Sequence, residues 1–211
     1  MTLLEFLDYL AISVFAATGA LSASRKQLDL IGFIFLAAVT GIGGGTFRDL
    51  VLGQLPVFWV RNPNYLLVCF ASAIVVYFTA HRFESRYRLL LWLDAIGLSA
   101  YAALGASKGL TATGSPEVAI VTGMMTAAFG GVLRDILAGE PSVLLRPEIY
   151  ISAAMAGAAV YIAADMLGFG QVASFLLAML ATFVIRGGAL VFGWTFPVYK
   201  ARPGRHPDDV M

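Results

Sequence analysis

Seven long apolar stretches, separated by short polar connections, run through this chain. A helix needs about 20 apolar residues to cross a bilayer, so stretches of about 18 to 25 residues, of which the third is the shortest at about 16, predict seven transmembrane helices. Charged residues make up only 13% of the 211 residues and hydrophobic residues 59%, which argues against a soluble protein because its core would be too large for its surface. The stretches are approximately Leu3–Leu21, Leu28–Phe47, Tyr65–Ala80, Leu89–Ser107, Val118–Leu137, Ile149–Leu167 and Val172–Phe196.

The second half of the chain repeats the first. Polar and glycine positions recur at a separation of 86 residues, which is the difference between 94 and 8 and between 135 and 49. Each copy holds three spans, an odd number, so the second copy is expected to enter the membrane from the opposite side. We therefore predict an all-α membrane protein of two inverted three-helix repeats plus a seventh helix. The matched pairs are Asp8 and Asp94, Ser13 and Ser99, Thr40 and Thr126, Gly44-Gly45 and Gly130-Gly131, Arg48-Asp49 and Arg134-Asp135, and Gly53 and Gly139.

One transmembrane domain is expected over residues 1–211, with repeats at about 3–80 and 89–167, the seventh helix at about 172–196 and a tail at 197–211. Ten Lys and Arg residues fall on one face of the membrane, and only Arg48, Arg61 and Lys108 fall on the other. The positive-inside rule then predicts an inner (plasma) membrane protein with its N-terminus outside and its tail in the cytoplasm. The ten are Arg25, Lys26, Arg82, Arg86, Arg88, Arg134, Arg146, Lys200, Arg202 and Arg205.

Adjacent glycines lie near the ends of the second and fifth spans: Gly43, Gly44 and Gly45 in the first copy, and Gly130 and Gly131 in the second. Glycine costs a helix roughly 1 kcal/mol against alanine and permits a bend or a break. Carbonyl groups freed there are tolerated where they face a water-filled path, and they can coordinate a cation. Close helix packing is the alternative, because small residues often form helix contacts in membranes. Duplication beside charged residues favours a pore.

Arginines close the second and fifth spans on opposite faces of the membrane, and each is followed by an aspartate: Arg48-Asp49 and Arg134-Asp135. A charge at the bilayer centre costs at least about 2.5 kcal/mol. The arginines are therefore expected either to reach an interface and pair with their aspartates, or to act as gates or lipid-headgroup anchors at the two mouths of one path.

The other recurring polar residues offer similar alternatives. Asp8 and Asp94 begin the first and fourth spans, where they either balance the arginine of their own repeat or compensate the helix dipole. Four hydroxyl groups either line the path or bond to their own helix. They belong to Ser13, Ser99, Thr40 and Thr126.

Arg186 lies within the seventh span and needs an interior partner, for which Asp165 or Asp94 is expected in a structural ion pair. His81 and His206 have no ligand-type side chains at metal-binding spacing, so no metal site or cofactor is predicted. No nucleophile has a plausible base within the spans, and the net charge of +1 gives no sign of nucleic-acid binding. We do not expect an enzyme.

Together, the inverted repeats, the doubled Gly-Gly-x-x-Arg-Asp motif and the seventh helix resemble the prokaryotic branch of the trimeric intracellular cation (TRIC) channel family, whose relatives are also labelled glycine transporters. The resemblance implies a homotrimer in membrane lipid, with a pore in each subunit that passes monovalent cations, potassium or sodium. It implies kinks at Gly43 to Gly45, Gly130 and Gly131, and gating roles for Arg48 and Arg134. The second motif keeps two of the three consecutive glycines, and the lysine-rich lipid-binding motif of the animal branch is replaced here by a single basic residue.

Three functions stay open from the residues alone. The first is a passive potassium-permeable channel, and the resemblance favours it. The second is a secondary transporter of a small amino acid such as glycine, in which the repeats rock and helix N-termini face the carboxylate. The third is a packing scaffold for other membrane proteins.

Overall fold

Helices form most of the part of the chain that the structure describes. The computed structural model describes residues 3–197, so the predicted tail beyond Pro197, with Lys200, Arg202, Arg205 and His206, lies outside the described residues. Within residues 3–197, six helices are long and apolar enough to cross a membrane, and α7, with 16 residues, is shorter. The predicted fold class, seven substantial helices in a membrane protein, is confirmed. The helices are α1 Leu3–Arg25, α2 Leu30–Val51, α3 Phe58–Arg61, α4 Asn64–Thr79, α5 Arg86–Thr113, α6 Pro116–Leu137, α7 Ile151–Met166 and α8 Gln171–Phe192, with 3-10 turns at Ala80–Arg82 and Val143–Leu145.

The duplication is visible in how α2 and α6 begin and end. A side-chain oxygen caps the start of each helix, since Asp29 accepts from the Gly32 amide and Ser115 from the Val118 amide. Each helix is closed by a glycine in the left-handed region, Gly53 at φ 66° and Gly139 at φ 61°. The next amide in each copy donates at 2.8 Å to the carbonyl of the motif aspartate, which completes a Schellman cap. The last glycine of the repeated motif therefore ends its helix.

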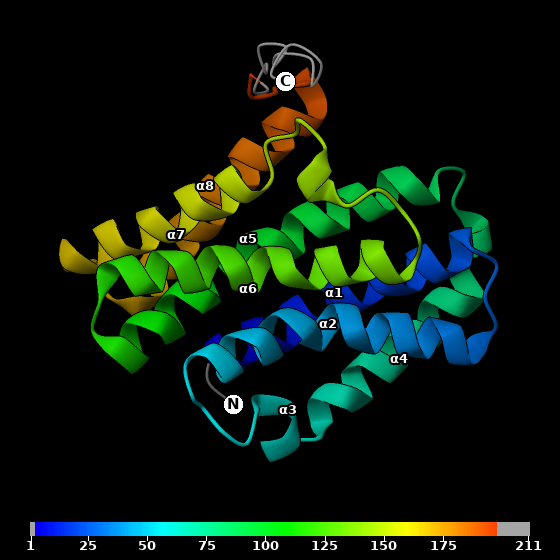
Figure 1. Ribbon diagram of the computed structural model, residues 1–211, viewed down its shortest axis with the longest axis horizontal. Coiled ribbons are helices and arrows are strands. Elements are labelled where there is room, and N and C mark those ends of the chain that lie inside the picture. The colour runs from blue at the N-terminus through cyan, green and yellow to red at the C-terminus, as the bar shows by residue number, and fades with distance from the viewer. Residues whose placement is uncertain (1–2, 198–211) are drawn as a thin grey trace, which may run out of the picture.

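The two repeats pack directly against each other. α1 contacts α5 and α2 contacts α6, while α4 packs on α1 and α2, and α7 packs on α5 and α6. Helix α8 has no counterpart in the first repeat and covers α5 and α7. Figure 1 shows α7 and α8 on one side of the α1, α2, α5 and α6 group, with α4 and the short α3 on the other. Small residues make these contacts close; a Cβ on Gly157 of α7, for example, would overlap Thr182 of α8.

Several predicted boundaries were wrong. α5 continues to Thr113, so Lys108 lies inside a helix and not in the predicted loop. The connection after α2 contains α3, which composition did not reveal because it is only four residues long. α8 stops at Phe192, before the predicted Phe196, because Gly193 adopts a left-handed conformation at φ 66°.

Candidate functional site

Helices α2 and α6 cross at the motif glycines. A Cβ built on Gly44 would lie 2.1 Å from the Thr126 carbonyl oxygen, and one built on Gly130 would lie 2.5 Å from the Thr40 carbonyl oxygen. Each glycine therefore contacts the backbone of the other helix. The contact is made at the threonine that lies four residues before the glycine of that helix. The reciprocal contact places the two copies of the motif face to face at the centre of the protein.

Both helices are continuous through their glycines, so the glycines do not break either helix. The remaining motif glycines make room for side chains. A Cβ on Gly43 would meet Leu133 at 2.8 Å, one on Gly45 would meet the Phe58 ring at 2.6 Å, and one on Gly131 would meet the Tyr150 hydroxyl at 2.7 Å. All five positions are contact positions in this conformation, as the packing alternative expected.

The four recurring hydroxyls all donate to carbonyls of their own helix, at distances of 2.5 to 2.7 Å. Thr40, Thr126 and Ser99 are buried, while Ser13 borders an apolar groove of about 440 Å³ between α1 and α4. Ser99 belongs to α5, which α8 contacts, whereas within residues 3–197 no equivalent helix contacts α1. Of the four, Thr40 and Thr126 lie at the crossing of α2 and α6.

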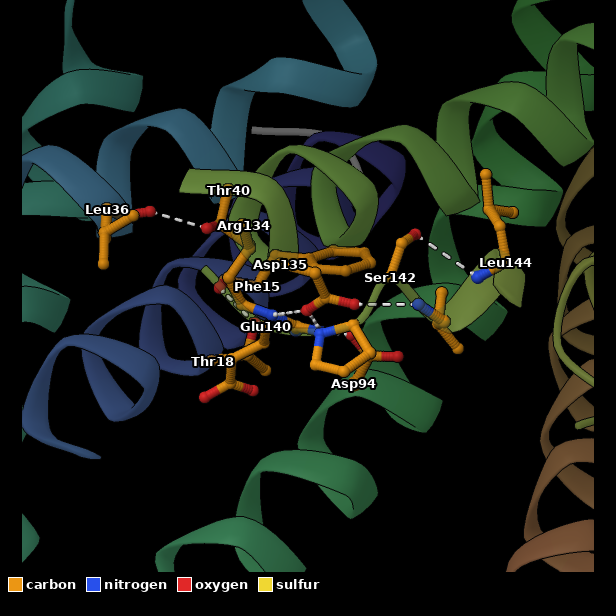
Figure 2. Close-up of polar contacts among 12 residues, drawn as sticks. Phe15, Thr18, Leu36, Thr40, Asp94, Arg134, Asp135, Glu140, Ser142 and Leu144 are labelled. Atoms are coloured by element: carbon orange, nitrogen blue, oxygen red, sulfur yellow. Dashed lines mark hydrogen bonds and ion pairs between the residues drawn. The ribbon is translucent and has the colours of Figure 1, made fainter. Parts of the chain in front are cut away.

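A buried charge cluster lies at one end of this crossing (Figure 2). Arg134, only 4% exposed, donates to Asp94 Oδ1 at 2.7 Å and twice to Asp135 Oδ1, at 2.9 and 3.0 Å. It also donates to the Thr18 hydroxyl of the first repeat at 3.1 Å. We call Asp94, Arg134 and Asp135 the inner cluster. The expectation that Asp94 balances the arginine of its own repeat is confirmed, and two carboxylates surround one cation.

The corresponding outer cluster consists of Asp8, Arg48, Asp49 and Lys108. Arg48 donates twice to Asp49 Oδ1, at 2.9 and 2.7 Å, and both side chains are buried. The first alternative for Asp8, an ion pair with the arginine of its own repeat, was wrong, because Asp8 pairs with Lys108 of the second repeat at 3.2 Å. Prediction missed this pair because Lys108 was assigned to a loop.

The motif aspartates also hold the connections that follow them. Asp49 Oδ2 accepts from the Phe58 amide at 2.8 Å, and Asp135 Oδ2 accepts from the Val143 amide at 3.0 Å. Corresponding residues of the two repeats are 86 positions apart at the motif aspartates but 85 positions apart at Phe58 and Val143. At the new separation Tyr65 matches Tyr150, a pair that the constant spacing of 86 concealed. Tyr65 donates to Asp8 at 3.2 Å, so this tyrosine contacts the outer cluster.

The outer cluster borders a cleft of about 310 Å³. With Glu5, which also lines the cleft, the cluster has three carboxylates against the two cations Arg48 and Lys108. The inner cluster also has one carboxylate in excess. The two arginines are therefore neutralised locally, and each end of the crossing is net negative, which suits a cation better than an anion. The lining residues are Glu5, Asp8, Gln54, Tyr65, Leu104, Ser107, Lys108, Thr111 and Gln171.

Arg186 of α8 is buried as expected, but both predicted partners were wrong. It pairs with Glu148 at 2.9 Å and donates to the Ile149 carbonyl at 3.1 Å. Glu148 was assigned to a polar connection. This connection folds back beside α8, and Glu148 forms an isolated β-bridge with Thr195 in the segment that follows α8.

Comparison with known proteins gives consistent matches. The family model described as Glycine transporter matches residues 5–81 and 91–166, one segment in each repeat. The crystal structure of the TRIC trimeric intracellular cation channel orthologue from Rhodobacter sphaeroides has a TM-score of 0.89 and 49% sequence identity, and covers 92% of this chain and 100% of that chain. A UPF0126 membrane protein of Vibrio cholerae is 36% identical over 202 residues, 94% of this chain and 83% of the relative. The UPF0126 inner membrane protein YadS of Escherichia coli is 33% identical over 202 residues, 93% of this chain and 96% of the relative.

Proposed function

This chain belongs to the prokaryotic TRIC channel family, and we propose that it forms a homotrimer in which each subunit contains its own path for potassium and other monovalent cations. The family is one of cation channels and not of enzymes. The observation that carries the proposal is the charge balance of the two clusters. The inner cluster alone, and the outer cluster together with Glu5 of the cleft, each have one carboxylate more than their cations, so a cation meets a negative potential at both ends of the crossing.

The path proposed here passes the outer cleft, the crossing of α2 and α6, and the inner cluster. Gly44 and Gly130 bring two backbones into contact at the crossing, so this conformation is closed there. Conduction requires α2 and α6 to move apart, which would uncover the Thr40 and Thr126 carbonyls as cation ligands. Arg48 and Arg134 act as gating residues in this scheme. Arg134 joins α6 to α5 through its ion pair with Asp94, and Arg48 fixes the neighbouring Asp49, which accepts from the Phe58 amide of the following connection.

The homotrimer and the orientation are also part of the proposal. The Rhodobacter sphaeroides relative is described as trimeric, and the Escherichia coli relative as an inner membrane protein. The excess of Lys and Arg at the connections after the first, third and fifth membrane-spanning helices supports an outer location for the N-terminus and the outer cleft. The inner cluster then faces the cytoplasm.

A carrier of a small amino acid is the second candidate, because the matching family model is described as Glycine transporter and the outer cleft offers both a carboxylate and an ammonium group. Both candidates are tested by placing the purified protein in potassium-loaded vesicles. A channel should release potassium down its gradient without added glycine, at rates that rise linearly with the gradient. No potassium release together with saturable glycine counterflow would favour the carrier, and protein-free vesicles provide the baseline.

A further inference from the structure

Helix α8 brings one buried cation to the edge of the second repeat. Arg186 is 1% exposed, and its guanidinium donates to Glu148 at 2.9 Å and to the Ile149 carbonyl at 3.1 Å. Its Nε has no hydrogen-bond partner within residues 3–197. The guanidinium also lies over the ring of Tyr150, with its Cζ 5.1 Å from the ring centroid, which is cation–π geometry.

Tyr150 connects this arginine to the inner cluster. Its side chain is fully buried, with Arg186 on the ring face. A Cβ built on Gly131 would lie 2.7 Å from the Tyr150 hydroxyl, 3.4 Å from Asp94 Oδ1 and 3.7 Å from Arg134 Nη2. The hydroxyl therefore lies on the same side of Gly131 as the Asp94–Arg134 pair and has no hydrogen-bond partner within residues 3–197, while the ring is fixed from α8.

The outer cluster is held differently, because α8 contributes there only Gln171, which lines the cleft and donates to Ser107 at 3.4 Å, and among the described residues no cation from α8 lies over the tyrosine ring. Tyr65, which matches Tyr150, stacks on Tyr9 at a centroid distance of 4.5 Å, and its hydroxyl bonds to Asp8 beside the open cleft. No helix equivalent to α8 covers the first repeat within the described residues. Helix α8 therefore makes the two ends of the crossing unequal. At the inner end, the tyrosine ring is fixed by a residue of α8, which lies outside the two repeats.

We propose that Arg186 is a positioning residue of the channel, which keeps the inner cluster closed by fixing Glu148, Ile149 and the Tyr150 ring. The Glu148 carboxylate is 30% exposed, so the attachment of α8 is accessible from the aqueous side. When Arg186 releases this segment, Tyr150 is free to leave the cluster, and Arg134 loses the packing that holds it against Asp94. The inference rests on the proposed channel function.

The test is single-channel recording of the full-length Arg186→Gln protein. Open probability is expected to rise about two- to fivefold, the factor that corresponds to a cation–π contact of about 0.5 to 1 kcal/mol. Unitary conductance should stay unchanged, because Arg186 does not border the proposed path. Arg186→Lys should fall between wild type and Arg186→Gln. Arg146→Gln is the matched control: Arg146 also approaches Glu148, at 3.7 Å, but its guanidinium lies over Tyr87 and not over Tyr150.

A double-mutant cycle tests the route through the ring. If Tyr150 transmits the effect, Arg186→Gln should change open probability little in a Tyr150→Leu background. Additive effects would overturn the proposal, as would an unchanged open probability in Arg186→Gln trimers.

Amide hydrogen exchange of purified trimers separates this inference from the channel proposal. Arg186→Gln should accelerate exchange in residues 143–150 relative to wild type and to Arg146→Gln, whether or not the protein conducts. Equal exchange in all three proteins would overturn the positioning role. If the wild-type protein carries no current but Arg186→Gln still accelerates exchange in residues 143–150, the channel proposal is rejected. The attachment of Tyr150 by Arg186 then still stands.

Discussion

Replacing Asp94 with asparagine is expected to destabilise the protein by about 3 kcal/mol, the lower end of the cost of breaking a buried ion pair from one side. Arg134 would keep Asp135 but lose the 2.7 Å contact to α5, and its guanidinium would remain buried with one counter-ion fewer. A loss of this size corresponds to a decrease of about 6 to 12 °C in melting temperature for a chain of 150–250 residues. Thermal unfolding of detergent-purified trimers measures it.

Asp8→Asn is the matched control, because Asp8 occupies the equivalent position of the first repeat. Its partner Lys108 is 33% exposed, so water compensates part of the lost interaction, and we expect a cost of about 1 kcal/mol or less. Equal melting temperatures for the two variants would contradict the assignment of Asp94 as the buried counter-ion of Arg134.

Gly44→Ala is expected to separate α2 from α6. The added Cβ would lie 2.1 Å from the Thr126 carbonyl oxygen, and a backbone atom in a continuous helix cannot rotate aside as a side chain can. Overpacking of this kind costs about 1 to 3 kcal/mol, although alanine is itself the better helix former. We expect a lower melting temperature and, in the surviving trimers, an altered potassium flux, because the crossing is the proposed constriction.

Gly43→Ala controls for the change of residue type within the same motif. Its Cβ would approach a methyl group of Leu133, the far end of a flexible side chain, at 2.8 Å, and the Gly130 Cα at 3.9 Å, which is an ordinary van der Waals distance. The variant should therefore fold and conduct almost as the wild type does. If Gly44→Ala were as mild as Gly43→Ala in both measurements, the crossing of α2 and α6 would not be the tight point of the structure.

Sequence reasoning predicted the features that depend on composition and constant spacing. The number of spans follows from their length, and the repeat follows from glycines and charges that recur at one separation. In each case the information lies in a pattern that the membrane imposes on the chain. The contact of Arg134 with Asp94 was one of two alternatives, and the same reasoning was wrong for Asp8 and Arg48, so recurrence in register did not by itself decide the pairing.

The features that sequence reasoning missed depend on small shifts of the backbone. Tyr150 escaped because one residue is lost between Asp135 and Val143, which moves it out of the register of 86. Glu148 looked like a loop residue, and only the folded connection places it against Arg186. The role of Gly44 depends on how closely two helices approach, and hydropathy contains no information about that distance. These residues require tertiary structure because their partners are distant in sequence.

Recording from single purified trimers in a planar bilayer under a potassium chloride gradient tests the account most directly. Excess carboxylates at both ends of the path should make the current cation-selective, so we predict unitary currents that reverse near the potassium equilibrium potential. Reversal near the chloride potential, which has the opposite sign, or the absence of any current from intact trimers would contradict it.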